Sequence, residues 1–171
     1  MNIRYFTCWL LGAWIAGSLF MIMVATQNFR SVDRLLAAPG SAAPRIEQMG
    51  REEARTFLRY QVSEQNRWYF ETWEKIQLGL GAVLVLAAMS MRKSFRFVIA
   101  LMLALLLIER LYLTPEIVRL GRLIDFVPQA ASSPERDLFW RYHGAYSAVE
   151  LIKLALSFFA SYRVIFTRQS A

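Results

Sequence analysis

Residues 5–25 of this chain read YFTCWLLGAWIAGSLFMIMVA, a run without a single charged side chain. An α-helix needs about 20 apolar residues to cross the hydrocarbon core of a bilayer. The run is longer than the apolar region of an ordinary signal peptide, so we interpret it as a retained first span. Three further runs, at about 68–91, 97–113 and 138–165, are also long and mostly apolar, although they contain charged residues. They predict three more spans.

The composition supports the same class of protein. Hydrophobic residues make up 56% of the 171 residues and aromatic residues 14%. A soluble core of this size cannot bury so much apolar side chain. The single cysteine, Cys8, excludes an intrachain disulfide and any metal site built on several cysteines. We therefore predict an all-α integral membrane four-helix bundle that forms one domain over residues 1–171.

The first long connection carries an amphipathic pattern. After Pro44, apolar residues recur at helical spacing through residues 45–66, with charged residues between them. This pattern predicts an amphipathic helix that either lies along the membrane surface or extends the second span outward. At the other long connection, Pro115 disfavours helix at the residue before it, so we expect the third span to end there.

The net charge of +7 would first suggest nucleic-acid binding. We discount this because the basic residues gather at the ends of the apolar runs, where a membrane protein meets anionic headgroups. The termini and the 92–96 turn share one side of the predicted bundle. Short loops rich in Lys and Arg favour the cytoplasm. We therefore expect a bacterial inner-membrane protein with both termini cytoplasmic and the lipid bilayer as its partner.

Polar residues gather at the opposite side. In an up-and-down bundle, the end of span one, the start of span two, the end of span three and the start of span four lie together. Charges inside a membrane are costly and normally face the bundle interior or a wet cavity. The predicted ligand- or cofactor-binding residues from these four ends are Asn28, Glu71, Glu74, Glu109, His143 and Glu150.

Two interpretations of these residues stay open. One is a polar cavity that opens toward the long loops and is closed at the far side. The other is a set of structural ion pairs that hold the bundle together, namely Glu109 with an arginine, Glu150 with Lys153 and Glu71 with Lys75.

The chemistry of such a cavity is left open by the residue types. Carboxylates and a histidine suit a metal ion, but the Glu-x-x-His pairs of four-helix di-iron proteins are absent from the sequence. Haem bound through His143 and a lipophilic, quinone-like ligand are further possibilities. An ion channel fits badly because no polar path continues through the apolar half. No cofactor, metal site or catalytic residue is assigned.

Three functions follow as hypotheses. The first is a binding or redox protein that holds a ligand, metal or cofactor at the candidate residues. The second is a structural or accessory subunit that docks a membrane protein partner through residues 45–66 and the small residues of the first span. The third is an enzyme for a lipophilic substrate, with His143 or a carboxylate as acid or base.

Two short segments suggest a family. Residues 113–117 read LTPEI and residues 139–146 read FWRYHGAY. With Asn28-Phe29-Arg30 after the first span, they resemble the transmembrane protein 205-like family of small four-helix membrane proteins, in its Thr-Pro-x-Ile and Phe-x-x-x-His-Gly segments. The resemblance implies the four-span architecture, adds weight to Pro115 and His143, and leaves the activity open because that of the family is uncharacterised.

Overall fold

The computed structural model describes residues 3–128, 131 and 133–166, and every regular element among them is a helix. This confirms the predicted all-α class. In chain order the elements are α1 (Ile3–Ala37), a short 3₁₀ turn η1 (Gly40–Ala42), α2 (Ala43–Met49), α3 (Arg51–Ala88), α4 (Lys93–Ile108), a π-helical turn η2 (Glu109–Leu113), α5 (Thr114–Ile124) and α6 (Pro134–Phe166).

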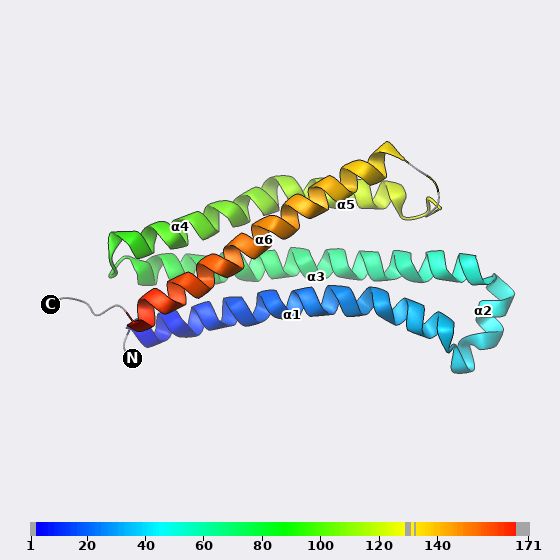
Figure 1. The fold of residues 1–171 in the computed structure, drawn as a ribbon, viewed down its shortest axis with the longest axis horizontal. Coiled ribbons are helices and arrows are strands. Elements are labelled where there is room, and N and C mark those ends of the chain that lie inside the picture. Colours follow the sequence, from blue (N-terminus) through cyan, green and yellow to red (C-terminus); the bar gives the residue numbers. More distant parts are fainter. Residues whose placement is uncertain (1–2, 129–130, 132, 167–171) are drawn as a thin grey trace.

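The long helices run beside one another and form an elongated bundle (Figure 1). Helix α1 contacts α3 and α6, α4 contacts α3 and α6, and α5 contacts α6. The chain termini and the turn between α3 and α4 lie at one end, which we call the terminal end. Helix α2 and the connection between α5 and α6 lie at the other, which we call the loop end (Figure 1).

The main apolar core occupies the half of the bundle near the terminal end. Its fully buried members include Leu11 and Trp14 of α1, Leu84 of α3 and Leu106 of α4. Close approach requires a small residue at Gly17, because a Cβ atom there would lie 2.0 Å from the Trp73 ring. Gly17 thus lets α1 approach α3 closely.

The amphipathic segment is a continuation of another helix. Residues 51–66 and the apolar residues 78–88 lie on the same uninterrupted helix, α3. A second core of Val32 and Leu36 from α1 covers the apolar side of this segment, with Ile46, Leu58 and Val62 packed against it. The segment therefore extends the second apolar run outward and uses its apolar face to hold the end of α1.

The prediction that the helix ends at Pro115 is wrong. The helical path runs from Lys93 to Ile124, through the π-helical turn Glu109–Leu113. Pro115 lies in the first turn of α5, where a backbone N–H is dispensable. A π turn changes the hydrogen-bond pattern locally, which removes the need for a donor at the proline.

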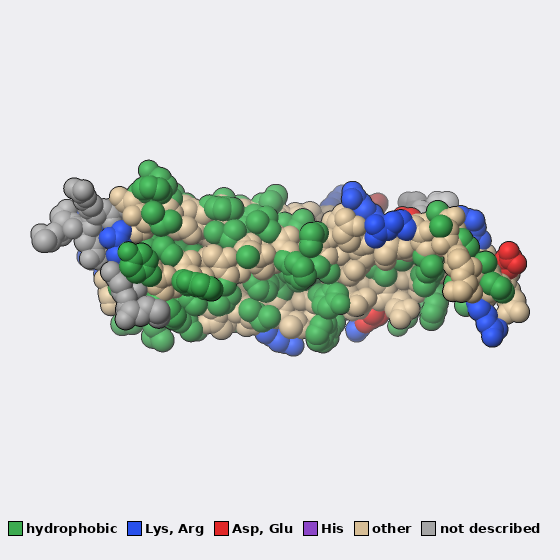
Figure 2. Space-filling model, turned by 90° about the horizontal axis from the view of Figure 1, so that it is seen from below, with side chains coloured by type: hydrophobic (Ala, Val, Ile, Leu, Met, Phe, Trp, Pro, Cys, Tyr) green, Lys and Arg blue, Asp and Glu red, His purple; other side chains and the backbone are tan. Residues whose placement is uncertain are grey.

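Much of the molecular surface is apolar. Trp9, Phe97 and Leu111 are 80%, 69% and 74% exposed. Figure 2 shows hydrophobic side chains over much of the visible face, most densely toward the terminal end. Among the described residues, two helical stretches, Ile3–Ala37 and Lys93–Ile124, are long and apolar enough to cross a membrane. These features are consistent with membrane association.

Candidate functional site

A buried lysine is the centre of the polar cluster. The Nζ of Lys153 on α6 donates hydrogen bonds to Gln77 Oε1 on α3 at 3.1 Å, to Glu150 Oε1 at 2.9 Å and to Glu109 Oε2 in η2. Lys153, Gln77 and Glu109 have no exposed surface. Burial of an ammonium group requires such partners, because its loss of hydration is otherwise uncompensated. The cluster ties α3, η2 and α6 together.

A third carboxylate lies one turn before Gln77 on the same face of α3. Glu74 is completely buried. The Thr114 hydroxyl donates to its Oε1, and Arg110 Nη1 lies 3.4 Å from its Oε2. Both partners come from the π-helical turn and the start of α5, so Glu74 joins these elements to α3.

The two charged residues of the π-helical turn point toward different partners. Glu109 and Arg110 are neighbours in sequence, yet Glu109 binds Lys153 and Arg110 binds Glu74. Successive residues of a helix point in directions roughly 100° apart, so neighbours serve different partners. Single π turns inside α-helices occur frequently at functional sites.

Two buried polar atoms of this cluster have no hydrogen-bond partner among the described residues. They are Glu109 Oε1 and the Tyr146 hydroxyl. Tyr146 is 7% exposed, its ring packs edge-on against Phe70, and Glu150, Glu74 and Glu109 lie close enough to interact with it electrostatically. Buried polar groups are nearly always paired, so Glu109 Oε1 is a spare hydrogen-bond acceptor, whereas the Tyr146 hydroxyl lies close to Glu150.

A depression on the surface lies beside the cluster. It is lined by Glu71, Arg110, Leu111, Thr114, Pro115 and Val118. Arg110 and Thr114 both line the depression and contact Glu74. The buried carboxylate of Glu74 is therefore one side chain away from a surface opening.

The structure brings three of the six predicted residues into one cluster. Glu109 and Glu150 share Lys153, and Glu74 lies within electrostatic range of Lys153. Glu71 lines the depression outside this cluster.

The other two predicted residues have different neighbours. Asn28 donates a hydrogen bond to Asn66 Oδ1 at 2.7 Å, which joins α1 to α3. The His143 ring stacks on Phe139 with centroids 5.7 Å apart and meets Trp140 edge-on. No described carboxylate pairs with His143.

The predicted ion pairs are right in one case. Glu150 pairs with Lys153 at 2.9 Å, as expected. Glu109 pairs with Lys153 and not with an arginine, because the long side chain of Lys153 reaches it from α6 while Arg110 points toward Glu74. Glu71 and Lys75, both described, form no ion pair, and the Lys75 side chain is exposed.

Sequence reasoning paired Lys153 with Glu150 but missed its contacts with Glu109 and Gln77, and it also missed the roles of Gln77 and Thr114. Gln77 lies three residues after Glu74, which puts both on one face of the helix. Nothing in the sequence indicated the contact of Thr114 with Glu74, because the residue before a proline is usually taken as the end of a helix.

The described part of the cluster is centred on an ammonium group. No three His, Cys, Asp or Glu side chains in the described part of the chain surround a point where a metal ion would fit. The ammonium group of Lys153 occupies the place between Glu109 and Glu150 that a cation would take.

A separate ion-pair network lies toward the loop end. Both terminal nitrogens of Arg67 bind Asp125, at 2.9 and 2.8 Å, and Glu64 accepts hydrogen bonds from Arg67 and Arg122. The hydrogen bond from Arg122, followed by that from Arg67, holds the pKa of Glu64 below its usual value. This network fixes α5 against α3 above the polar cluster.

Comparison with known proteins adds no further information about the site, since no family model, curated protein or solved structure matches this chain.

Proposed function

We propose that this chain is an integral membrane protein, a bundle of four transmembrane helices, and that it binds a small cationic ligand at Glu74 from the loop end. The observation that carries the ligand site is the contact of the buried Glu74 carboxylate with Arg110 and Thr114, two residues that line an opening at the surface.

The exposed apolar surface supports the membrane part of this proposal. Soluble monomers rarely expose large contiguous apolar patches. Helices α3 and α6 carry charges that lower their mean hydropathy, but Glu74 of α3 and Lys153 of α6 are buried and do not face the surroundings, whereas Lys75 of α3 is exposed. The 35 residues of α1 give a length of about 50 Å, which exceeds the hydrocarbon thickness of ~30 Å. The excess length leaves room for the Arg67–Asp125 network to lie outside the bilayer, as we propose.

The balance of charge supports a cationic ligand. Glu74, Glu109 and Glu150 are opposed by only Lys153 and Arg110, so the cluster contains one more carboxylate than cation. Glu71 adds a further carboxylate at the rim of the depression. Burial disfavours the charged form of these carboxyl groups, and an added positive charge favours it; an amine also donates to spare acceptors such as Glu109 Oε1. A primary amine suits this site by both charge and hydrogen bonding.

Native mass spectrometry of the protein in mild detergent tests the proposal. We expect a stoichiometric bound mass in the unmodified protein, its loss in Glu74→Gln and its retention in Glu116→Gln. Glu116 is a matched control because it is paired with Arg119 on the surface of α5. The side chain of glutamine keeps the shape of glutamate and removes its charge. Loss of one charge-assisted hydrogen bond predicts binding at least about tenfold weaker.

If the natural ligand dissociates during purification, a known amine can be added as a probe of the site. Hexylamine should raise the melting temperature of the unmodified protein more than hexanol does, and Glu74→Gln should abolish the difference. The proposal would be contradicted if the purified protein carried no bound mass and if hexylamine and hexanol raised its melting temperature equally.

The second candidate function is a structural role for the cluster in an accessory subunit. It is favoured by Lys153, whose ammonium group already has three acceptors and needs no ligand. The apolar face of residues 45–66 gives it less support, because Val32 and Leu36 cover that face. Under this alternative, Glu74→Gln changes stability and leaves every bound mass unchanged.

A further inference from the structure

The terminal end of the bundle is strongly basic. Asp and Glu are absent from residues 1–32, 75–108 and 151–171. The start of α1, the turn between α3 and α4 and the end of α6, which belong to these stretches, meet at the terminal end (Figure 1). The same end carries Arg4, Arg92, Lys93, Arg96 and Arg163, and Arg168 of the predicted basic side lies outside the described residues. Since no acidic side chain is near in sequence, the positive potential there is large.

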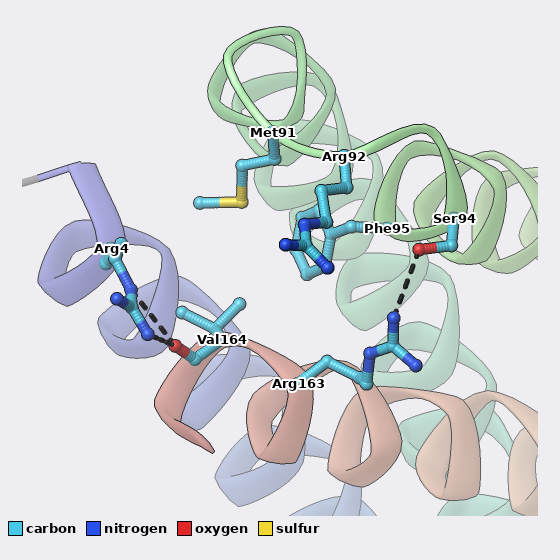
Figure 3. A pocket seen from close by; sticks show the side chains of 7 residues that line it. All are labelled: Arg4, Met91, Arg92, Ser94, Phe95, Arg163 and Val164. Carbon is cyan, nitrogen blue, oxygen red and sulfur yellow. Dashed lines mark hydrogen bonds between the residues drawn. The ribbon is translucent and has the colours of Figure 1, made fainter. Parts of the chain in front are cut away.

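A cleft at this end is lined by residues from three separate segments. Arg4 comes from the start of α1, Arg92 and Ser94 from the turn into α4, and Arg163 from the end of α6; the apolar side chains Met91, Phe95 and Val164 complete the lining. Figure 3 shows Arg4, Arg92 and Arg163 around the same opening. Three guanidinium groups that repel one another are thus held together by the fold.

Two of these arginines are positioned by neutral oxygen atoms. Arg4 Nε donates to the Val164 carbonyl at 3.1 Å, and Arg163 Nη2 donates to the Ser94 hydroxyl at 3.3 Å. These contacts orient the guanidinium groups of Arg4 and Arg163. Arg92 is the N-cap residue of α4, so the positive end of that helix dipole adds to the field in the cleft.

We propose that this cleft binds the phosphate group of an anionic phospholipid. Arginine matches phosphate because its planar fork donates two parallel hydrogen bonds. The Met91, Phe95 and Val164 side chains in the same cleft suit the start of an acyl chain, which a free phosphate ion lacks. The site lies at the opposite end from Glu74, and the inference depends only on the membrane embedding proposed above.

The test compares phosphatidylglycerol with phosphatidylcholine, which has the same phosphate without a net charge. Native mass spectrometry of the purified full chain, titrated with each lipid in mild detergent, measures the bound fraction. We expect the unmodified protein to retain phosphatidylglycerol at least about fivefold more than phosphatidylcholine. The double variant Arg92→Gln/Arg163→Gln should lose this preference. The matched control Lys93→Gln/Arg96→Gln removes the same charge from the same end but outside the cleft, and should keep most of it.

Several outcomes would overturn the proposal. If Arg92→Gln/Arg163→Gln and Lys93→Gln/Arg96→Gln lose the preference for phosphatidylglycerol equally, only the overall positive charge of this end attracts the lipid. Equal retention of both lipids by the unmodified protein, or binding of inorganic phosphate with no bound phosphatidylglycerol, would also reject it. If Arg92→Gln/Arg163→Gln does not fold, Arg92→Lys/Arg163→Lys keeps the charge and removes the planar fork; an unchanged preference in that variant would refute specific phosphate recognition. Extraction of the protein from membranes by alkaline carbonate would instead refute the embedding.

Discussion

Replacement of Lys153 by methionine should destabilise the bundle by about 3–5 kcal/mol, which is the usual cost of removing one partner from a buried ion pair. The Lys153 side chain is fully buried and donates to Glu109, Glu150 and Gln77. Methionine has a similar length and fills the space, so little of this cost comes from a cavity. The cost comes from the carboxylate of Glu109, which would lose its only hydrogen-bonded cation in a site without solvent access.

The assay is equilibrium unfolding in mixed micelles, followed by tryptophan fluorescence, which α1 and α3 supply through Trp14 and Trp73. A loss of ~4 kcal/mol changes the unfolding equilibrium roughly a thousandfold. Adding Glu109→Gln to Lys153→Met removes the unpaired charge and should recover at least half of the loss, which a double-mutant cycle measures.

The exposed Lys93 at the start of α4 provides the control, since Lys93→Met should change stability by less than about 0.5 kcal/mol. The reasoning is refuted if Lys153→Met costs less than about 1 kcal/mol. It is also refuted if the double variant is as unstable as Lys153→Met alone, because the loss would then not arise from the buried carboxylate.

Two further predictions concern packing and pH. Gly17→Ala should cost about 1–3 kcal/mol, because its Cβ would overlap the Trp73 ring, whereas Gly12→Ala meets open space and should be tolerated; thermal unfolding of both variants checks this. Because the hydrogen bond from Arg122 lowers the pKa of Glu64, its contribution to stability is present above the usual pKa of 4.5 and is lost as the pH falls through the lowered value. Melting temperatures between pH 6 and pH 3 should therefore fall less in Glu64→Gln than in the unmodified protein, and equal slopes would argue against the ion pair.

The sequence predicts the helices well because apolar periodicity is a local property. Residues 51–88 contain no proline, so the amphipathic segment and the apolar run continue as one helix. The end of the third helix was predicted wrongly because the rule for the residue before proline is a preference of an isolated dipeptide. In the folded chain, the π turn at Glu109–Leu113 and contacts of α5 with α6 outweigh that preference.

The candidate site was predicted in part, for a reason that lies in helix geometry. Connectivity and the cost of buried charge bring Glu74, Glu109 and Glu150 together. His143 and Glu150 share one face of α6, but seven residues separate them by about 10 Å along the axis, so they differ in depth. Asn28 pairs with Asn66, which lies two turns before Glu74 on α3. A pattern in one helix indicates a face, whereas depth depends on how neighbouring helices are staggered.

The two ends of the bundle differ in a way that limits the function. Polar groups reach from the loop end to Lys153, and beyond them the core of Leu11, Trp14, Leu84 and Leu106 fills the interior. A charged ligand that enters beside Arg110 meets this apolar layer, where each unpaired charge costs several kcal/mol. If a ligand binds as proposed, it leaves in this conformation by the end at which it entered. This asymmetry supports the proposal of a protein that binds or senses its ligand from one side and does not conduct it across the membrane.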